Sequence, residues 1–164
     1  MAGQHARRLL RVLINNIPVV REVEDYTSAT PAKELADTRG GSFIKGKILT
    51  GIEAMQGTIK IKGMTPQLAK QYGYGPGSRI AVTIKESFDD EDGEQISSQE
   101  EWIGTVGKRE RSGGASPEDT LTIEVDSSKR VVSGQLEWHV DRLSHICDLG
   151  QGDLLADHRA SVGL

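Results

Sequence analysis

The chain has 164 residues, a length that fits one domain burying about two-thirds of the surface that its unfolded form exposes, so we expect a single domain over residues 1–164. Its net charge of −4 argues against a protein that binds nucleic acids through general phosphate contacts. The single cysteine, Cys147, excludes an internal disulfide and favours folding in a reducing compartment.

The composition also indicates the fold class. Hydrophobic residues make up 36% of the chain but aromatic residues only 4%, so Val, Ile and Leu must supply most of the core. Their β-branched runs, together with 19 glycines, favour a mainly β fold with many turns. No apolar run approaches the roughly 20 residues of a membrane-spanning helix, and the N-terminal stretch lacks a signal-peptide cleavage site. We therefore expect no membrane span and a soluble protein made in the cytoplasm.

The first elements are predicted to form a hairpin. Residues 1–8 are a polar, basic lead that we expect to be loose or to lie on a neighbouring molecule. Residues 9–14 are predicted to form a strand, and Asn15-Asn16 suits a two-residue turn because asparagine tolerates a positive φ. Residues 17–23 would return as the partner strand, with a proline that indicates a sheet edge, and residues 24–32 would form a connector.

The chain is organised around residues 33–63, which contain three predicted extended segments. Residues 33–37 lead into a Gly-rich turn, residues 42–49 run back, and residues 56–62 (QGTIKIK) alternate apolar and charged side chains as a half-buried strand does. A hairpin with one apolar face normally packs that face on its own protein. The alternative is a hairpin that reaches out to pair with another subunit.

A short helix and a pair of strands are predicted next. Thr65-Pro66 suits a helix start, with Thr as the N-cap and Pro at the first helical position, and this helix would plug an open end of the sheet structure. Residues 79–88 alternate strongly and place Ile80, Val82 and Ile84 on one face. An acidic turn at residues 89–94 leads to an extended segment at residues 97–111.

The last part of the chain carries the clearest alternation. After a loop at residues 111–119, whose composition predicts mobility, two strands follow with a turn at Ser133-Gly134. Their predicted buried faces comprise Leu121, Ile123 and Val125 in the first strand, and Leu136, Trp138 and Val140 in the second. Asp153 is expected to cap a short C-terminal helix that carries Leu154, Leu155 and His158.

Catalytic and ligand-binding motifs fail on their spacing. The acidic turn does not match a calcium loop, because Phe88 and Gln99 would occupy its first and last ligand positions. The stretch of Gly104, Gly107 and Lys108 does not have the spacing of a phosphate-binding loop.

Side chains suited to catalysis or metal binding are not grouped either. Glu100 and Glu101 would point to opposite faces of a strand, so they could not act together as a general acid and a general base. His145 and Cys147 are the one close pair of good transition-metal donors, and a tetrahedral site needs a second pair. We expect no enzyme activity, no cofactor and no metal site.

Several stretches, taken in chain order, carry a resemblance to a known family. They are RVLINN with its return strand, ADTRGG, GIEAMQGTIKIKGM, FDDEDGE, VGKRER, VSGQLEWHVD and LLADHRASVGL. Their order and spacing are similar to those of the major tail tube proteins of contractile-tailed phages, a family that also supplies the tube of R-type bacteriocins. Three positions depart from the family pattern: Thr38 replaces an aromatic residue, Ser42 replaces a methionine, and the opening turn is Asn15-Asn16 instead of Asn-Gly.

The resemblance implies a fold and an assembly. The fold is a small β-barrel or sandwich with one short flanking helix, a long inter-subunit β-hairpin and a short C-terminal helix. Six copies would close into a ring, and the rings would stack into the hollow inner tube of a contractile tail, through which phage DNA passes without specific binding. The implied partners are the sheath, baseplate and tail terminator proteins, and the implied location is the virion tail after assembly in the host cytoplasm.

The residues that would line the bore or contact a neighbouring subunit all lie in the organising segment, and each of them could instead be a solvated surface residue. The candidates are Lys33, Glu34, Asp37, Arg39, Gly40, Gly41, Lys45, Lys47, Glu53, Lys60 and Lys62.

Two other functions remain open from the sequence. The chain could form the tube of an R-type bacteriocin, a type VI system or an extracellular contractile injection system, which share the same assembly but carry a different cargo. From a different class, it could be a stand-alone β-barrel that binds a ligand or an oligonucleotide. That function needs an aromatic or basic patch, whereas the two Trp, three Tyr and two Phe residues are scattered.

Overall fold

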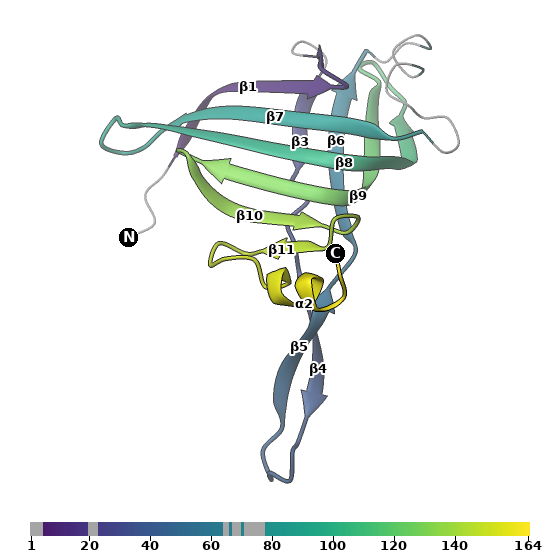
Figure 1. The fold of residues 1–164 in the computed structure, drawn as a ribbon. Helices are drawn as coiled ribbons and strands as arrows, with labels where there is room; N and C mark the ends of the chain where they lie inside the picture. The colour runs from purple at the N-terminus through teal and green to yellow at the C-terminus, as the bar shows by residue number, and fades with distance from the viewer. Residues whose placement is uncertain (1–4, 20–22, 64–65, 67–69, 71–77) are drawn as a thin grey trace.

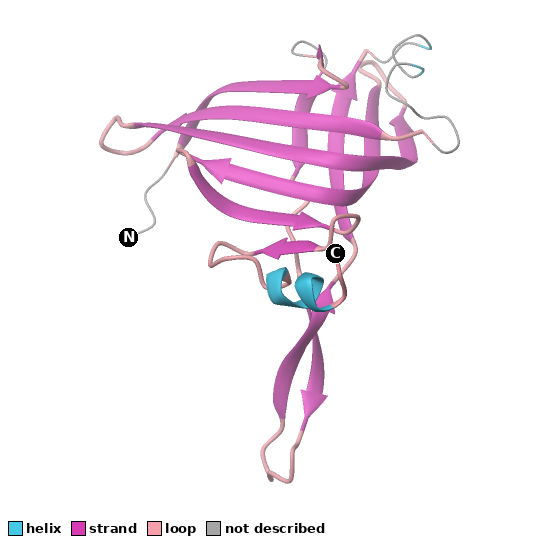
Figure 2. Cartoon of the chain, in the orientation of Figure 1, coloured by secondary structure: helices cyan, strands magenta, loops and turns pink. Residues whose placement is uncertain are grey.

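The structure is a computed structural model that describes residues 5–19, 23–63, 66, 70 and 78–164 (Figures 1 and 2). The described part is mainly β, as the composition predicts, and the helix expected from Thr65 lies outside the described residues. The elements are β1 (Ala6–Ile14), β2 (Ile17–Pro18), β3 (Val23–Thr27), β4 (Lys33–Thr38), β5 (Gly46–Ile52), β6 (Met55–Lys62), β7 (Ile80–Asp89), β8 (Gln95–Ser112), β9 (Glu118–Val132), β10 (Gln135–Asp141), β11 (Ile146–Asp148) and α2 (Ala156–Ser161).

One antiparallel sheet of nine strands forms the body of the protein. Its main path runs β11-β10-β9-β8-β7-β1-β2, while β6 pairs with the first half of β9 and β3 pairs with β6. β1, β7, β8, β9 and β10 form one layer, and β3 and β6 run across behind it (Figure 1). No described strand joins β3 to β1 or β2, so the described sheet is folded over on itself and is not a closed barrel.

The fold in the sheet depends on bulges in the pair of strands β8 and β9. The register of β8 against β9 shifts between Ile103 and Gly104, and again between Val106 and Lys108. A Cβ atom at Gly104 would overlap the backbone carbonyl of Glu124, so only glycine allows this approach of the two strands. Bulges bend a strand and increase its twist, which lets β8 and β9 pass from one layer to the other. The glycines that superficially resembled a phosphate loop therefore have a structural role.

The core lies between the two layers. Ile80, Val82 and Ile84 of β7 and Leu121 and Ile123 of β9 are buried, which confirms the alternation predicted for both strands. Leu136 is the exception, because it lies at the exposed start of β10.

Trp102 of β8 joins the front layer to the rear one. Its side chain is completely buried. The ring lies against Gly57 of β6, where a Cβ atom would come within 2.5 Å of it, and its centroid is 6.3 Å from that of Tyr26 on β3. An aromatic ring of this size supplies much of the apolar area that holds the layers together.

The N-terminal region differs from the prediction. Asn15 and Asn16 have φ values of 52° and 64°, so the predicted turn is confirmed. The return strand is much shorter than expected, because β2 ends at Pro18, and the long partner of β1 is β7. The segment predicted as a connector contains β3, whose partner β6 is distant in sequence and is not indicated by any local pattern.

The basic lead is also partly ordered, because β1 begins at Ala6. Ala6 pairs with Asp89 at the end of β7, and the guanidinium of Arg8 donates a hydrogen bond to the carboxylate of Asp89 at 2.8 Å. Arg7 lies 3.4 Å from Asp25 and 3.6 Å from Glu86. Residues 6–8 therefore form part of the protein's own sheet.

A buried carboxylate organises the polar contacts of the core. Glu100 of β8 is 2% exposed, whereas Glu101 is exposed, which confirms that the two side chains point to opposite faces. The Oε1 atom of Glu100 accepts hydrogen bonds from Trp102 Nε1 at 2.7 Å, Ser28 Oγ at 2.6 Å and the Ala29 N–H at 3.2 Å. Its Oε2 atom lies 3.3 Å from the guanidinium of Arg130 on β9. A buried charge is tolerated when it is paired and hydrogen-bonded in this way.

This network fixes the start of the segment that leads into β4. The N–H of Ala29 donates to Glu100, and the carbonyl oxygen of Ala29 accepts a hydrogen bond from Ser128 Oγ at 2.9 Å. Ser128 in turn accepts from Trp138 Nε1 at 2.9 Å. Further along, the Glu53 N–H donates to the Ala32 carbonyl at 2.9 Å. The chain that enters β4 and the chain that leaves β5 are thus both held to the body.

We predict that Glu100→Ala lowers the free energy of unfolding by about 3–5 kcal/mol, because it removes the shared acceptor of three donors in the core and one of the two carboxylates that pair with the half-buried Arg130. Chemical denaturation of the protomer measures this effect. Glu101→Ala is the matched control on the opposite face, and its expected effect is within about 0.5 kcal/mol. Equal losses in the two variants would contradict the role of Glu100.

Candidate assembly surface

β4 and β5 form a separate two-stranded hairpin that extends away from the body (Figures 1 and 2). Leu35 pairs with Leu49, Asp37 with Lys47 and Thr38 with Gly46, and the register shifts between Glu34 and Leu35. Nearly all residues of both strands are exposed, and in the described part of the chain no further strand pairs with either of them. The hairpin therefore does not pack an apolar face on its own body, which was the ordinary expectation for such a pattern.

The hairpin exposes large apolar side chains. Phe43 at the tip is 99% exposed and Ile44 is 77% exposed, while Leu35, Ile48 and Leu49 along the two strands are about half exposed. Open strand edges with apolar side chains favour pairing with another chain, and natural proteins usually cover them. The contact residues predicted from the sequence are the charged residues of this segment with Gly40 and Gly41. They do not include Phe43 and Ile44, although two adjacent apolar residues beside a Gly-rich turn are a visible signal.

The structure places most of the predicted site residues together on the hairpin. Lys33, Glu34 and Asp37 lie on β4, and Lys47 lies on β5. Arg39, Gly40, Gly41 and Lys45 form the tip, and Glu53 follows β5 at the base.

Lys60 and Lys62 are the exceptions, because they lie on β6 in the body. Lys62 Nζ is 3.0 Å from Glu24 Oε1, and this contact, with a smaller contribution from Glu118, lowers the pKa of Glu24. The sequence could not separate these two lysines from the hairpin, since β5 and β6 are nearly contiguous in the chain.

The tip has a defined backbone. Gly40 and Gly41 have φ values of 49° and 78°, in a region of the backbone map that residues with a Cβ atom rarely adopt. The Ser42 N–H donates to the Arg39 carbonyl at 2.7 Å, and the Ile44 N–H donates to Ser42 Oγ at 3.2 Å. The turn reverses the chain and holds the following two apolar residues out into solvent.

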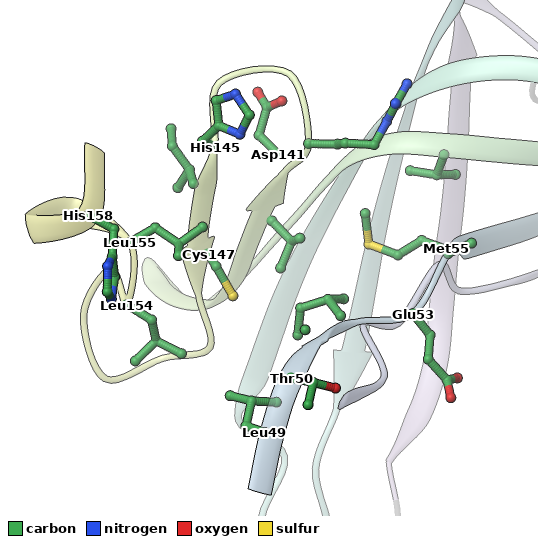
Figure 3. Close-up of a pocket in the computed structure, with 17 residues that line it drawn as sticks. Leu49, Thr50, Glu53, Met55, Asp141, His145, Cys147, Leu154, Leu155 and His158 are labelled. Carbon is green, nitrogen blue, oxygen red and sulfur yellow. The ribbon is translucent and has the colours of Figure 1, made fainter. Parts of the chain in front are cut away.

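An apolar groove of about 550 Å³ lies beside the base of the hairpin (Figure 3). One wall is the end of β5 with the chain leading to Met55, and the other is the end of β10, β11 and the segment before α2. Its apolar lining includes Ile52, Met55, Val140, Cys147, Leu154 and Leu155. Burial raises the pKa of the Cys147 thiol, and the nearby Asp153 and Asp148 raise it further, so the thiol is neutral at physiological pH.

Asp153 fixes the second wall of this groove. The prediction that Asp153 caps a helix carrying Leu154 and Leu155 is wrong, because α2 begins at Ala156 after an N-cap at Leu155. Instead, Asp153 Oδ1 accepts hydrogen bonds from the Leu155 N–H at 3.0 Å and the Cys147 N–H at 3.1 Å.

Arg159 of α2 completes this connection. Its guanidinium is 2.6 Å from Asp153 Oδ2 and donates to the His145 carbonyl at 2.7 Å. Asp153 therefore ties α2 to β11, and its carboxylate acts as a connector between two elements.

The described residues hold neither a cluster suited to a metal ion nor a helix suited to crossing a membrane. They contain no group of three or more His, Cys, Asp or Glu side chains placed to hold a metal ion. No helix in that part of the chain is long and apolar enough to span a membrane.

This fold is shared by tail tubes. It is similar to a chain of the sheath–tube complex of the extracellular contractile injection system PVC, in its extended state, with a TM-score of 0.55 and 12% identity over 75% of this chain and 88% of that one. It is also similar to the SPP1 tail tube, with a TM-score of 0.53 and 17% identity over 82% of this chain and 79% of that one. No curated protein sequence is significantly similar to the chain.

The mainly β body with a projecting hairpin is thus a fold that this chain shares with solved tail tubes. The sequence itself matches the model of the phage tail tube protein FII family over residues 8–163, and the chain belongs to this family. The resemblance seen in the sequence is confirmed, and the protein is a structural component of the virion tail.

We predict that Asp153→Asn destabilises the protein at neutral pH and that the difference from the unchanged protein vanishes in acid. The hydrogen bonds from Leu155 and Cys147, with the contact to Arg159, hold the pKa of Asp153 below its usual range. The stability that the carboxylate contributes is therefore present above its unfolded-state pKa of about 3.9 and is lost as the pH falls through the lower folded-state value. Thermal unfolding between pH 7 and pH 2 measures it.

The matched control is Asp92→Asn in the exposed turn between β7 and β8. This substitution should leave the melting temperature nearly unchanged at every pH. A pH-independent difference between Asp153→Asn and the unchanged protein would show that the charge of Asp153 is not what ties α2 to β11.

Proposed function

We propose that six copies of this chain close into a ring and that the rings stack into the hollow inner tube of a contractile tail, the conduit for DNA delivery. The exposed hairpin is the observation that carries this proposal. Its strands have open edges and its tip exposes Phe43 and Ile44, so its burial requires another copy or another protein. Pairing such edges around a closed ring removes the hazard of open-ended aggregation in the plane of the ring, and stacking extends the assembly along one axis.

The charged residues of the hairpin are proposed to line the bore or to contact neighbouring subunits. Asp37 and Lys47 are opposite each other on the two strands, so their opposite charges partly cancel within the hairpin. Lys33, Glu34, Arg39, Lys45 and Glu53 remain available for contacts between copies. Phage DNA would pass without specific binding, since the net charge of −4 repels a polyanion.

The same proposal also specifies the partners of the protein and the compartment in which it assembles. The chain acts as one tail-tube unit over residues 1–164, without enzyme activity, cofactor or metal. Its partners are the sheath, baseplate and tail terminator proteins, and it is assembled in the host cytoplasm. A contractile injection device with another cargo would use the same subunit contacts, and the proteins encoded beside it would distinguish the two.

A stand-alone barrel that binds a ligand or an oligonucleotide is the less favoured function. Base stacking needs exposed aromatic rings on a surface, whereas Trp102 and Trp138 are buried and form part of the core network. The fully exposed ring of Phe43 stands at the end of a projecting hairpin and not on a sheet face.

We predict that replacing both tip glycines, Gly40→Val with Gly41→Val, leaves a folded protomer that does not form tubes. The added Cβ atoms meet no neighbours, so the cost is confined to the left-handed backbone of the tip, roughly 1–2 kcal/mol per residue, and the tip must change its shape. Negative-stain electron microscopy and size-exclusion chromatography across a concentration series measure assembly, with baseplate and sheath proteins added where nucleation is needed.

The matched control replaces Gly93 and Gly114, which also have positive φ values and open surroundings but lie in turns of the body. This control should form hollow tubes with six-fold end views, like the unchanged protein. Normal tubes from the Gly40 and Gly41 variant would rule out the hairpin as the assembly element. A protein that stays monomeric under all of these conditions would contradict the tube itself.

A further inference from the structure

The hairpin tip and the groove are two unmatched apolar surfaces of one chain. The tip presents Phe43 and Ile44, which are 99% and 77% exposed. The groove of about 550 Å³ is of the size that proteins use to enclose apolar groups, and Cys147, Leu154 and Leu155 point toward it from one side (Figure 3). An apolar insert and an apolar receptor on the same molecule are expected to meet when copies assemble.

The tip cannot reach the groove of its own chain. The base of the hairpin forms part of the groove wall, from Leu49 to Met55. At about 3.3 Å per residue, Gly46 at the outer end of β5 lies about 20 Å from Ile52 and about 10 Å from Leu49, where the groove wall begins. The hairpin also points away from the body (Figure 1). Any contact between the two surfaces must therefore join different copies.

The charges of the two surfaces are complementary. The segment from Thr38 to Gly46 contains Arg39 and Lys45 and no acidic residue. The groove is lined by Glu53 and Asp141, and within the described part of the chain neither carboxylate is ion-paired. The basic residues of the lining are Arg142, which is already paired with Asp126 at 2.8 Å, and the histidines His145 and His158.

We propose that the hairpin tip of a second copy of this chain docks in the groove, with Phe43 and Ile44 inserted and with Arg39 and Lys45 facing Glu53 and Asp141. This inference rests on the proposed assembly and specifies its contact. The interface is heterologous, because the surface that one copy donates differs from the surface that it offers to the next copy. A contact of this kind repeats in one direction from copy to copy, which suits a ring or a stack and does not stop at a dimer.

The test is disulfide trapping between two populations of the full chain, both in a Cys147→Ala background. One population carries Phe43→Cys at the tip, and the other carries Leu154→Cys at the half-exposed rim of the groove. They are mixed in equal amounts under assembly conditions and treated with a mild oxidant. Mass spectrometry then counts the mixed disulfide, and electron microscopy of the same sample counts tubes. The control replaces Leu154→Cys by Leu9→Cys, at an exposed leucine on β1.

We expect the mixed disulfide with Leu154→Cys to form at least about tenfold faster than that with Leu9→Cys, because docking raises the effective concentration of the two thiols. The same experiment with Ile44→Cys keeps the Phe43 ring, so it still reports docking if the loss of that ring in Phe43→Cys weakens the contact. Tubes without preferential linkage from either tip position would overturn the docking contact and leave the tube intact. Preferential linkage without tubes would support the contact and contradict the proposed function.

Discussion

The position of the hairpin depends on the buried carboxylate of Glu100. Removing a charge from water is costly, and here Ser28, Ala29, Trp102 and Arg130 surround it with donors. Two of these donors belong to the chain just before β4, so the same contacts that satisfy the charge also fix the base of a long projecting element. A few hydrogen bonds at this base set the direction of the hairpin, and a small change there would be amplified at the tip.

The body and the hairpin obtain their stability from different sources. The body buries Val, Ile, Leu and Trp102 between two layers of one folded sheet, which is possible because bulges near Gly104 bend β8 and β9. The hairpin buries almost nothing and keeps its shape through its turn and its strand register. A protomer built in this way can fold by itself and still carry an element that is complete only in an assembly, where apolar surface is removed from water.

Much of the fold could be predicted from local patterns. The alternation of β7 and β9, the turns at Asn15-Asn16 and Ser133-Gly134 and the turn of the organising hairpin are confirmed, because period-2 burial and positive φ leave clear signals. The predictions failed where distant partners decide the structure: β3 pairs with β6, which no local signal indicates, and Asp153 connects to β11 instead of capping a helix. The partner of β1 was missed for the same reason, since β7 is far away in sequence.

The sequence by itself determined the mainly β class, the buried faces of the long strands, the turn positions and the family resemblance, because each of these is written in residues that are close together in the chain. Only the tertiary structure decided that Lys60 and Lys62 lie apart from the hairpin, that Phe43 and Ile44 are exposed, and that a groove opens beside Met55 and Cys147. These features arise from contacts between distant segments, such as Ala29 with Glu100 and Ser128. Local propensity does not encode such contacts, since they form only when the whole sheet has folded over.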